Sequence, residues 1–215
     1  MTKSLINYDQ ALYYLQEADI IMAQIISEIG DYQLAEFKSN SSLLEALAWA
    51  IMAQQISTEV ANKIYQRFLS LYNESTPLNA RNLLQTSDED LRSIGISRYK
   101  IGYLKNLARA VEEYLPPLSE LATMEDETII KLLTQIKGIG TWTVQMLLIF
   151  RLQRLDILPS GDLGIRMAIK NLYQLPELPS PEIVEAIGHK WKPYRTIAAW
   201  YLWRSLSDTI EKIQF

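Results

Sequence analysis

Short amphipathic segments with helical spacing follow one another along the whole chain, and this pattern limits the fold more than any other feature. In each segment apolar residues return every three or four positions, as on one face of an α-helix. No convincing run alternates apolar and polar residues, which would be the pattern of a half-buried strand. The connecting stretches are a few residues long. The sequence therefore predicts an all-α protein.

Capping residues, glycines and prolines predict where these helices begin and end. We expect one long first helix ended by Gly30, and a second helix capped by Ser41 or Ser42. Ser57 is expected to cap the third, and Pro77 to open a fourth at its first position. The remaining helices are expected over residues 88–94, 98–115, 125–133, 141–152, 162–173, 181–188 and 193–207, and the first three over 8–29, 43–51 and 58–69.

Composition excludes several classes of active site. The 215 residues contain no cysteine, which excludes a disulfide scaffold, a thiol nucleophile, a cysteine-ligated zinc and an iron–sulfur cluster. The single histidine, His189, cannot form a histidine-rich metal site or a convincing serine-type triad. The N-terminus lacks the pattern of a signal peptide, and no apolar run is long enough to span a bilayer. We expect an intracellular protein, cytoplasmic or associated with the nucleoid or nucleus.

The charge distribution is uneven. The net charge is −4, which by itself argues against a nucleic-acid partner. Residues 137–204, however, carry nine Lys and Arg against five Asp and Glu, whereas residues 1–136 carry eleven against eighteen. Uneven solvated faces would produce the same gradient, so the basic stretch is only a weak indication of an anionic partner.

A tight glycine turn separates two expected helices at Gly138-Ile139-Gly140. Glycine allows unusual backbone angles and a close approach by another backbone. The turn amides then lie at the N-terminus of the second helix, which suits a phosphate, and Lys137 adds a positive charge. An ordinary helical hairpin also carries glycine at a helix end, so this motif alone leaves both interpretations open.

Several motifs together resemble the helix-hairpin-helix (HhH-GPD) DNA glycosylase superfamily, in the branch of 3-methyladenine DNA glycosylase II. The resemblance covers about residues 40–207. The order and spacing of these motifs carry it: Ala53-Gln54-Gln55-Ile56-Ser57, Gly95-Ile96-Ser97-Arg98-Tyr99-Lys100, Gly138-Ile139-Gly140-Thr141-Trp142-Thr143, Leu158-Pro159-Ser160-Gly161-Asp162 and Trp191-Lys192-Pro193-Tyr194-Arg195.

The resemblance implies a two-lobed helical fold in residues 1–215, with the active-site cleft between the lobes. The helix-hairpin-helix would cover about residues 127–152. The N- and C-terminal helices would share one lobe, and the middle helices would form the other. Larger bacterial members begin with a β-rich domain, which we expect to be absent because the first forty residues have a helical pattern.

Asp162 is the residue that the resemblance makes catalytic. A base is flipped out of the duplex before its glycosidic bond is cut, and the bond breaks through a sugar cation that a nearby carboxylate stabilises. Asp162 stands twenty residues after Trp142. Its position also suits a helix N-cap, and the two roles do not exclude each other.

The resemblance also implies a pocket for an alkylated purine. Such a base carries positive charge, which electron-rich rings hold by cation–π attraction. Trp142 and Trp203 match the pocket aromatics, although plain core packing would explain them equally well. Met146 occupies a pocket position that is aromatic in some relatives, and this bears on the base preference.

The remaining implied site residues would contact DNA or a cation. Gln55 is the candidate to fill the gap left by the flipped base, with Gln54 beside it, although a helix-end glutamine pair explains them too. The DNA contacts would further include Lys137, Gly138, Gly140, Thr141 and Arg195. Main-chain carbonyls of Thr134, Ile136 and Ile139 would hold a Na⁺ or K⁺ ion, and no other cofactor is expected.

Trp142 also bears on the reaction type. Bifunctional relatives such as endonuclease III carry a lysine nucleophile at this position, so the resemblance implies a monofunctional enzyme that uses water. We expect a monomer that excises alkylated purines of the 3-methyladenine or 7-methylguanine type from double-stranded DNA. Two alternatives stay open: a glycosylase for hypoxanthine, ethenoadenine or uracil, and a non-catalytic helix-hairpin-helix scaffold that binds DNA.

Overall fold

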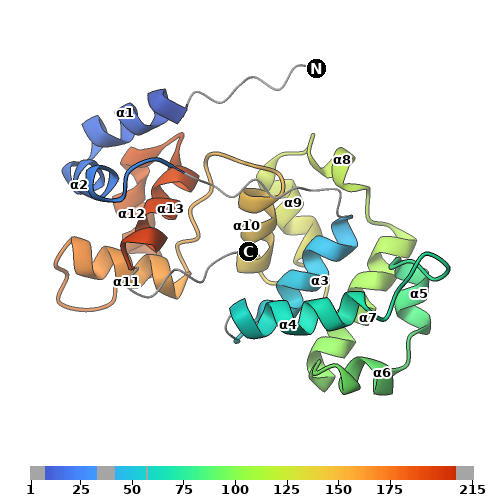
Figure 1. The fold of residues 1–215 in the computed structure, drawn as a ribbon. Helices are drawn as coiled ribbons and strands as arrows, with labels where there is room; N and C mark the ends of the chain where they lie inside the picture. Colours follow the sequence, from blue (N-terminus) through green and yellow to red (C-terminus); the bar gives the residue numbers. More distant parts are fainter. Residues whose placement is uncertain (1–7, 33–41, 57, 207–215) are drawn as a thin grey trace. The chain divides into compact units, whose positions relative to one another are not determined.

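The computed structural model describes residues 8–32, 42–56 and 58–206, and Figure 1 shows their arrangement. This part of the chain forms helices and connecting loops without a strand, which confirms the all-α prediction. None of its helices is both long and apolar enough to cross a bilayer. The helices are α1 (Tyr8–Ala18), α2 (Ile20–Ile29), α3 (Leu43–Ala53), α4 (Thr58–Leu69), α5 (Ala80–Gln85), α6 (Asp88–Ser93), α7 (Arg98–Glu113), α8 (Leu118–Leu121), α9 (Asp126–Leu133), α10 (Thr141–Phe150), α11 (Leu163–Leu172), α12 (Pro181–Gly188), the 3-10 helix η1 (His189–Trp191) and α13 (Arg195–Ser205).

Contacts divide these helices into two compact units. The first unit contains α1 and α2 together with α11, α12, η1 and α13, so it joins the two ends of the described chain. The second unit contains α3 to α10.

In the first unit α13 is the central helix. Helices α2 and α11 pack against it, and Ile197, Ala199, Tyr201 and Leu202 are buried on it. The Tyr201 hydroxyl donates to the Gly30 carbonyl at 2.8 Å, which ties the end of α2 to the same helix. Most of α13 is therefore buried within the first unit.

The predicted single helix over residues 8–29 is wrong, because Asp19 interrupts it and separates α1 from α2. This residue is extended (φ −154°, ψ 114°), and its Oδ1 caps α2 by accepting from the Ile21 N–H at 3.0 Å. Its Oδ2 accepts from the Tyr173 hydroxyl and from the Trp191 indole at 2.9 Å. Lys190 lies 3.0 Å from the same oxygen. These donors come from distant sequence positions, so local helical periodicity could not reveal the break.

The buried Asp19 carboxylate should make the free energy of unfolding depend on pH in the acidic range. Burial alone raises the pKa of Asp19, but hydrogen bonds from Tyr173, Trp191 and Lys190 outweigh it and leave the pKa below its ordinary 3.8. A carboxyl group whose pKa is lower in the folded state stabilises the fold at pH values above the pKa of the unfolded state. This contribution is lost as the pH falls through the pKa of the folded state. We expect Asp19→Asn to cost roughly 1–2 kcal/mol at neutral pH, with a smaller difference from wild type near pH 3. Urea titrations across this range measure the difference, and a constant difference would contradict the prediction.

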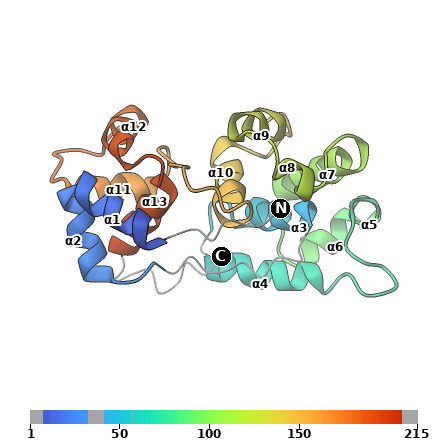
Figure 2. The same cartoon turned by 90° about the horizontal axis from the view of Figure 1, so that it is seen from above.

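In the second unit α3 is the central helix, as Figures 1 and 2 show. Helices α4, α7 and α10 pack against it, and most of its residues are buried. Ser42 closes a capping box with Glu45, which starts α3 at the predicted place. Helix α9 packs against α10, so the two helices that flank Gly138 lie side by side.

Two other helix starts differ from the prediction by two or more residues, and one helix is additional. The helix expected to open at Pro77 begins at Ala80, because the Asn79 side chain accepts from the Asn82 N–H at 2.8 Å and caps it. The last helix begins at Arg195 rather than Pro193, after η1. The short helix α8 was not expected at all. Ser57, the predicted cap of α4, lies outside the described residues.

Candidate active site

Asp162 is the N-cap of α11, as its position in the sequence suggested. Its backbone is extended (φ −67°, ψ 130°), and its Oδ1 accepts from the Ile165 N–H at 2.9 Å. The positive end of the helix dipole favours a negative charge at this position. The cap is therefore confirmed, and it holds a carboxylate in one orientation at a helix terminus.

The same carboxylate oxygen has a second donor on α13. The Trp203 indole Nε1 donates to Asp162 Oδ1 at 2.9 Å, although the two residues are 41 positions apart. Gly164 lies between them, where an added Cβ would be 3.0 Å from Asp162 Oδ1 and 3.2 Å from Trp203 Cδ1. Glycine thus allows the indole to approach the first turn of α11. The pattern of pocket aromatics indicated Trp203, but its hydrogen bond to Asp162 left no signal in the sequence.

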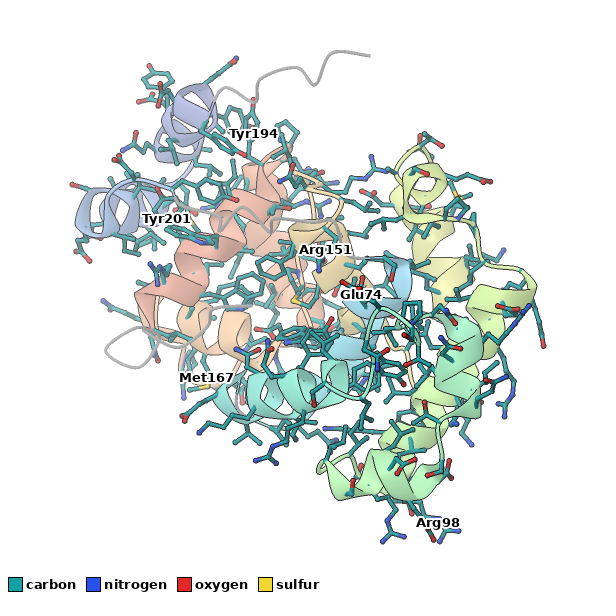
Figure 3. The ribbon with its side chains drawn as sticks, turned by 45° about the vertical axis from the view of Figure 1, so that its right-hand side comes forward. Glu74, Arg98, Arg151, Met167, Tyr194 and Tyr201 are labelled. Atoms are coloured by element: carbon teal, nitrogen blue, oxygen red, sulfur yellow. The ribbon has the colours of Figure 1, made fainter. Side chains whose placement is uncertain are left out.

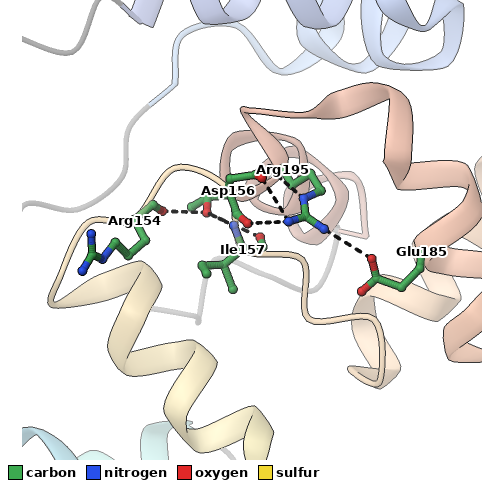
Figure 4. Close-up of polar contacts among 6 residues, drawn as sticks. Arg154, Asp156, Ile157, Glu185 and Arg195 are labelled. Carbon is green, nitrogen blue, oxygen red and sulfur yellow. Dashed lines mark hydrogen bonds and ion pairs between the residues drawn. The ribbon is translucent and has the colours of Figure 1, made fainter. Parts of the chain in front are cut away.

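The loop that leads to Asp162 is fastened to the start of α13 (Figure 4). Arg195 forms a bidentate pair with Asp156, with Nε 2.6 Å from Oδ1 and Nη2 3.0 Å from Oδ2, and its Nη1 lies 3.3 Å from Glu185. Thr196 Oγ1 donates to the Arg154 carbonyl at 2.7 Å and accepts from the Ile157 N–H at 3.0 Å. These bonds set the path of the chain a few residues before Asp162.

Arg195 was expected to contact DNA, and that contact stays a prediction. The structure adds a different role, because the guanidinium side chain is only 17% exposed and two carboxylates balance its charge. Sequence reasoning missed Asp156 and Glu185 as its partners. Lys190 is likewise engaged with Asp19 rather than extending freely from η1.

The glycine turn between α9 and α10 is held against α7. Gly138 has φ +105°, a conformation that side chains rarely adopt. A Cβ there would lie 2.2 Å from the Tyr103 ring carbon Cγ, so both the backbone angle and the packing require glycine. Gly140 is the N-cap of α10, and Thr141 is exposed at its first turn. The amides of this first turn lack intrahelical acceptors, as at any helix start.

In the structure the loop that carries Gln54 and Gln55 lies against this hairpin. Gln54 Nε2 donates to the Gly138 carbonyl at 2.9 Å, across 84 positions of sequence. Lys100 on α7 donates to the carbonyls of Met52 and Gln54 at 2.8 and 2.7 Å, which fixes the end of α3. Gln55 is exposed and has φ +60°, an uncommon left-handed conformation for a residue other than glycine. The loop is thus anchored through Gln54 and presents Gln55 to solvent.

Met146 lines a cavity within the second unit, between α3, α4 and α10. The cavity has a volume of about 390 Å³. Trp49, Tyr65 and Phe150 provide aromatic walls, and Asn62, Gln66 and Arg151 add polar groups. Sequence reasoning did not identify these six residues, since they match no motif. Trp142 is half-buried on the same helix but does not line this cavity.

The predicted site residues therefore fall into two groups, one in each unit. Asp162, Trp203 and Arg195 belong to the first unit. The second unit holds the remaining residues of the predicted site: Gln54, Gln55, Thr134, Ile136, Lys137, Gly138, Ile139, Gly140, Thr141, Trp142 and Met146.

Comparisons with known proteins find similar DNA glycosylases. DNA-3-methyladenine glycosylase 1 of Schizosaccharomyces pombe is 35% identical over 197 residues, which cover 91% of this chain and 86% of that protein. The solved structure of the S. pombe 3-methyladenine DNA glycosylase with abasic DNA superimposes with a TM-score of 0.85, covering 91% of this chain and 96% of that one at 35% identity.

A bacterial structure leads to the same conclusion. The DNA-3-methyladenine glycosidase of Bacillus halodurans has a TM-score of 0.78 at 33% identity, covering 94% of this chain and 91% of that one. A family model described as the HhH-GPD superfamily of base excision DNA repair proteins matches residues 48–193, more than half of the chain. The chain described above, with its capped Asp162 and its glycine hairpin, belongs to the HhH-GPD superfamily of base excision DNA repair proteins.

Proposed function

We propose that this protein is a monofunctional DNA glycosylase that removes alkylated purines from double-stranded DNA. The carboxylate of Asp162, held at a helix N-terminus by the Ile165 N–H and the Trp203 indole, is the observation that carries the proposal. The named relatives with 3-methyladenine activity support the substrate class. We further propose that the protein acts as a monomer and works in the compartment that contains the DNA.

In this reaction Asp162 stabilises the sugar as its glycosidic bond breaks. The alkylated base leaves with the electron pair of the bond, and it leaves as a neutral molecule because it began as a cation. The negative charge of Asp162 offsets the positive charge that develops on the sugar. Water then adds to the sugar carbon, and its proton passes to the carboxylate or to solvent. The leaving base needs no general acid.

We assign Trp142, Met146 and Trp203 to recognition of the base. The ring faces of the two tryptophans would attract a cationic purine, with a contribution of roughly 0.5–2 kcal/mol each. Gln55 would take the place of the flipped base, since it is exposed on an anchored loop. Phosphate contacts would come from Lys137, Gly138, Gly140 and Thr141, with Gln54 holding the loop and Arg195 near Asp162.

A monovalent cation would fit the end of α9. The proposed ligands are the carbonyls of Thr134, Ile136 and Ile139, in the region where helix carbonyls lose their intrahelical donors. Ile136 O accepts from the Ile139 N–H at 3.0 Å, and a carbonyl oxygen has a second lone pair. Such an ion would add positive charge beside the turn that we assign to a phosphate. No other cofactor is proposed.

A panel of lesion duplexes tests the proposed activity. The full chain is incubated with duplexes that contain 7-methylguanine, 3-methyladenine, hypoxanthine, 1,N6-ethenoadenine or uracil, and released base is measured. We expect release of the alkylated purines. Preferential release of hypoxanthine, 1,N6-ethenoadenine or uracil would contradict the proposed substrate class. DNA binding without release of any base would favour a non-catalytic DNA-binding scaffold.

The absence of a lyase step is a separate prediction. Trp142 stands where bifunctional relatives carry lysine, so no Schiff base should form with the opened sugar. We expect excision to leave an intact strand that breaks only after alkali or an abasic endonuclease is added. A borohydride-trapped adduct between protein and DNA would show that this prediction is wrong.

A further inference from the structure

Positive charge is concentrated on α7. Residues 98–110 carry Arg98, Lys100, Lys105 and Arg109 and no acidic residue. The surrounding stretch 37–152 is neutral, with twelve Lys and Arg against twelve Asp and Glu. The charges of this stretch are therefore segregated, because residues 98–110 hold four of its twelve cations and none of its twelve acidic residues.

A groove follows the exposed side of α7. It has a volume of about 780 Å³. Gly102 is exposed and lines the groove, and a Cβ added there would meet nothing within 4 Å. Tyr99 stands at the rim and is 80% exposed, and Figure 3 shows the Arg98 side chain extending away from the ribbon. The lining is completed by Leu84, Asp88, Ile101, Tyr103, Lys105, Asn106, Arg109 and Lys137.

The cations of this groove differ in what they can offer a ligand. Lys105 donates to the carbonyls of Leu83, Leu84 and Thr86, so it contributes charge rather than further hydrogen bonds. Arg109 donates from Nη1 to Asn106 Oδ1 at 3.0 Å, which leaves other N–H groups of its guanidinium to donate. Within the described residues neither Arg98 nor Arg109 is paired with a carboxylate.

The groove continues into the glycine hairpin. Lys137, the residue before the turn, lines it. Asn106 Nδ2 donates to the Lys137 carbonyl at 3.3 Å, and the Tyr103 ring lies directly against Gly138. The two surfaces belong to one compact unit and share these contacts.

We propose that the α7 groove binds the phosphate backbone of duplex DNA beyond the phosphate held at the hairpin. The inference rests on the proposed function, since that function makes the hairpin a phosphate site. Arg98 and Arg109 are eleven residues apart. At 1.5 Å per residue this is about 16 Å, the axial rise of about five base pairs. A row of this length matches a linear polyanion, whereas a single small anion would need convergent donors.

Two pairs of variants test the groove in the full chain. Arg98→Ala/Arg109→Ala removes its two cations without a carboxylate partner, and Lys63→Ala/Arg67→Ala removes two exposed cations of α4 as the control for net charge. Gly102→Glu adds an acidic side chain to the lining of the groove, and Gly102→Gln is the neutral control. Both Gly102 replacements remove a glycine from a helix interior, so they should not weaken the fold.

The measurement is the dissociation constant for an abasic-analogue duplex as a function of salt. Each lost phosphate contact lowers the salt slope by about one, so the Arg98/Arg109 variant should lose about two. We expect Gly102→Glu to weaken binding at least about fivefold more than Gly102→Gln. Slopes equal to that of the Lys63/Arg67 control would overturn the proposal.

Failure of this proposal and failure of the proposed function can be told apart. The groove residues are not assigned to the base or the sugar, so single-turnover excision at saturating enzyme should be unchanged in the Arg98/Arg109 variant. If the wild-type protein excises alkylated purines but the Arg98/Arg109 variant keeps the salt slope of the control, only the proposal of DNA binding in the groove is wrong. A reduced slope in a protein that excises no base would support the groove and overturn the glycosylase activity.

Discussion

Asp162→Asn should lose base excision by about 10²–10⁴-fold and keep DNA binding and stability close to wild type. The structure makes this a clean substitution. Asp162 Oδ1 accepts from the Ile165 N–H and the Trp203 indole, and the amide oxygen of asparagine can accept both bonds. The helix cap is then preserved, because asparagine caps helices about as well as aspartate. Only the negative charge is removed.

The measurement is single-turnover release of 7-methylguanine at saturating enzyme, together with anisotropy titration of an abasic-analogue duplex. Asp162→Ala is the companion variant, since it loses the cap as well as the charge. It should also lower the free energy of unfolding by about 1 kcal/mol. Near-normal excision by Asp162→Asn would remove this residue from the catalytic role and leave only the cap.

Trp203→Phe should lower excision by about 10–100-fold although it keeps an aromatic ring on α13. The substitution removes the indole N–H that donates to Asp162 Oδ1 at 2.9 Å. A hydrogen bond to a charged group contributes roughly 1.5–3 kcal/mol, which corresponds to the expected range. We infer that Trp203 is a positioning residue, which acts by holding the carboxylate, in addition to its assignment to the base pocket.

A double-mutant cycle separates these two roles. If Trp203 acts through the charge of Asp162, Trp203→Phe should cost little in the Asp162→Asn background. Trp200→Phe is the matched control on the same helix, because Trp200 packs against Tyr32 and Tyr201 and is assigned to no site. Equal losses in both backgrounds would show that Trp203 acts on the base alone.

Much of the helical pattern was predictable because caps act locally. Ser42, Ser87 and Asp162 each accept from a backbone N–H three residues further on, at or within one residue of the predicted helix starts. Pro181 stands at the first turn of α12, and the bounds of that helix match the prediction. Each of these signals is contained within one helical turn, so the sequence is sufficient to recognise it.

Asp19 and Pro77 show where local signals were insufficient. Periodicity continues through Asp19, but partners from the far end of the chain hold it extended. At Pro77 the preference of proline for a first helical turn was overruled by the Asn79 cap three residues before Asn82. In both places a polar side chain that caps the helix determines at which residue the helix begins.

The linear order of residues determined the all-α class, most helix boundaries and, through motif spacing, the candidates Asp162, Trp142 and the glycine hairpin. Only the tertiary structure decided how these residues are held. The indole of Trp203 on Asp162, the guanidinium of Arg195 on Asp156 and the amide of Gln54 on the Gly138 carbonyl join positions 41, 39 and 84 residues apart. Asp162 is a cap by its local sequence, and it becomes an oriented carboxylate through a bond from a distant helix. Side-chain hydrogen bonds of this range depend on the packing of whole helices, which no local pattern encodes.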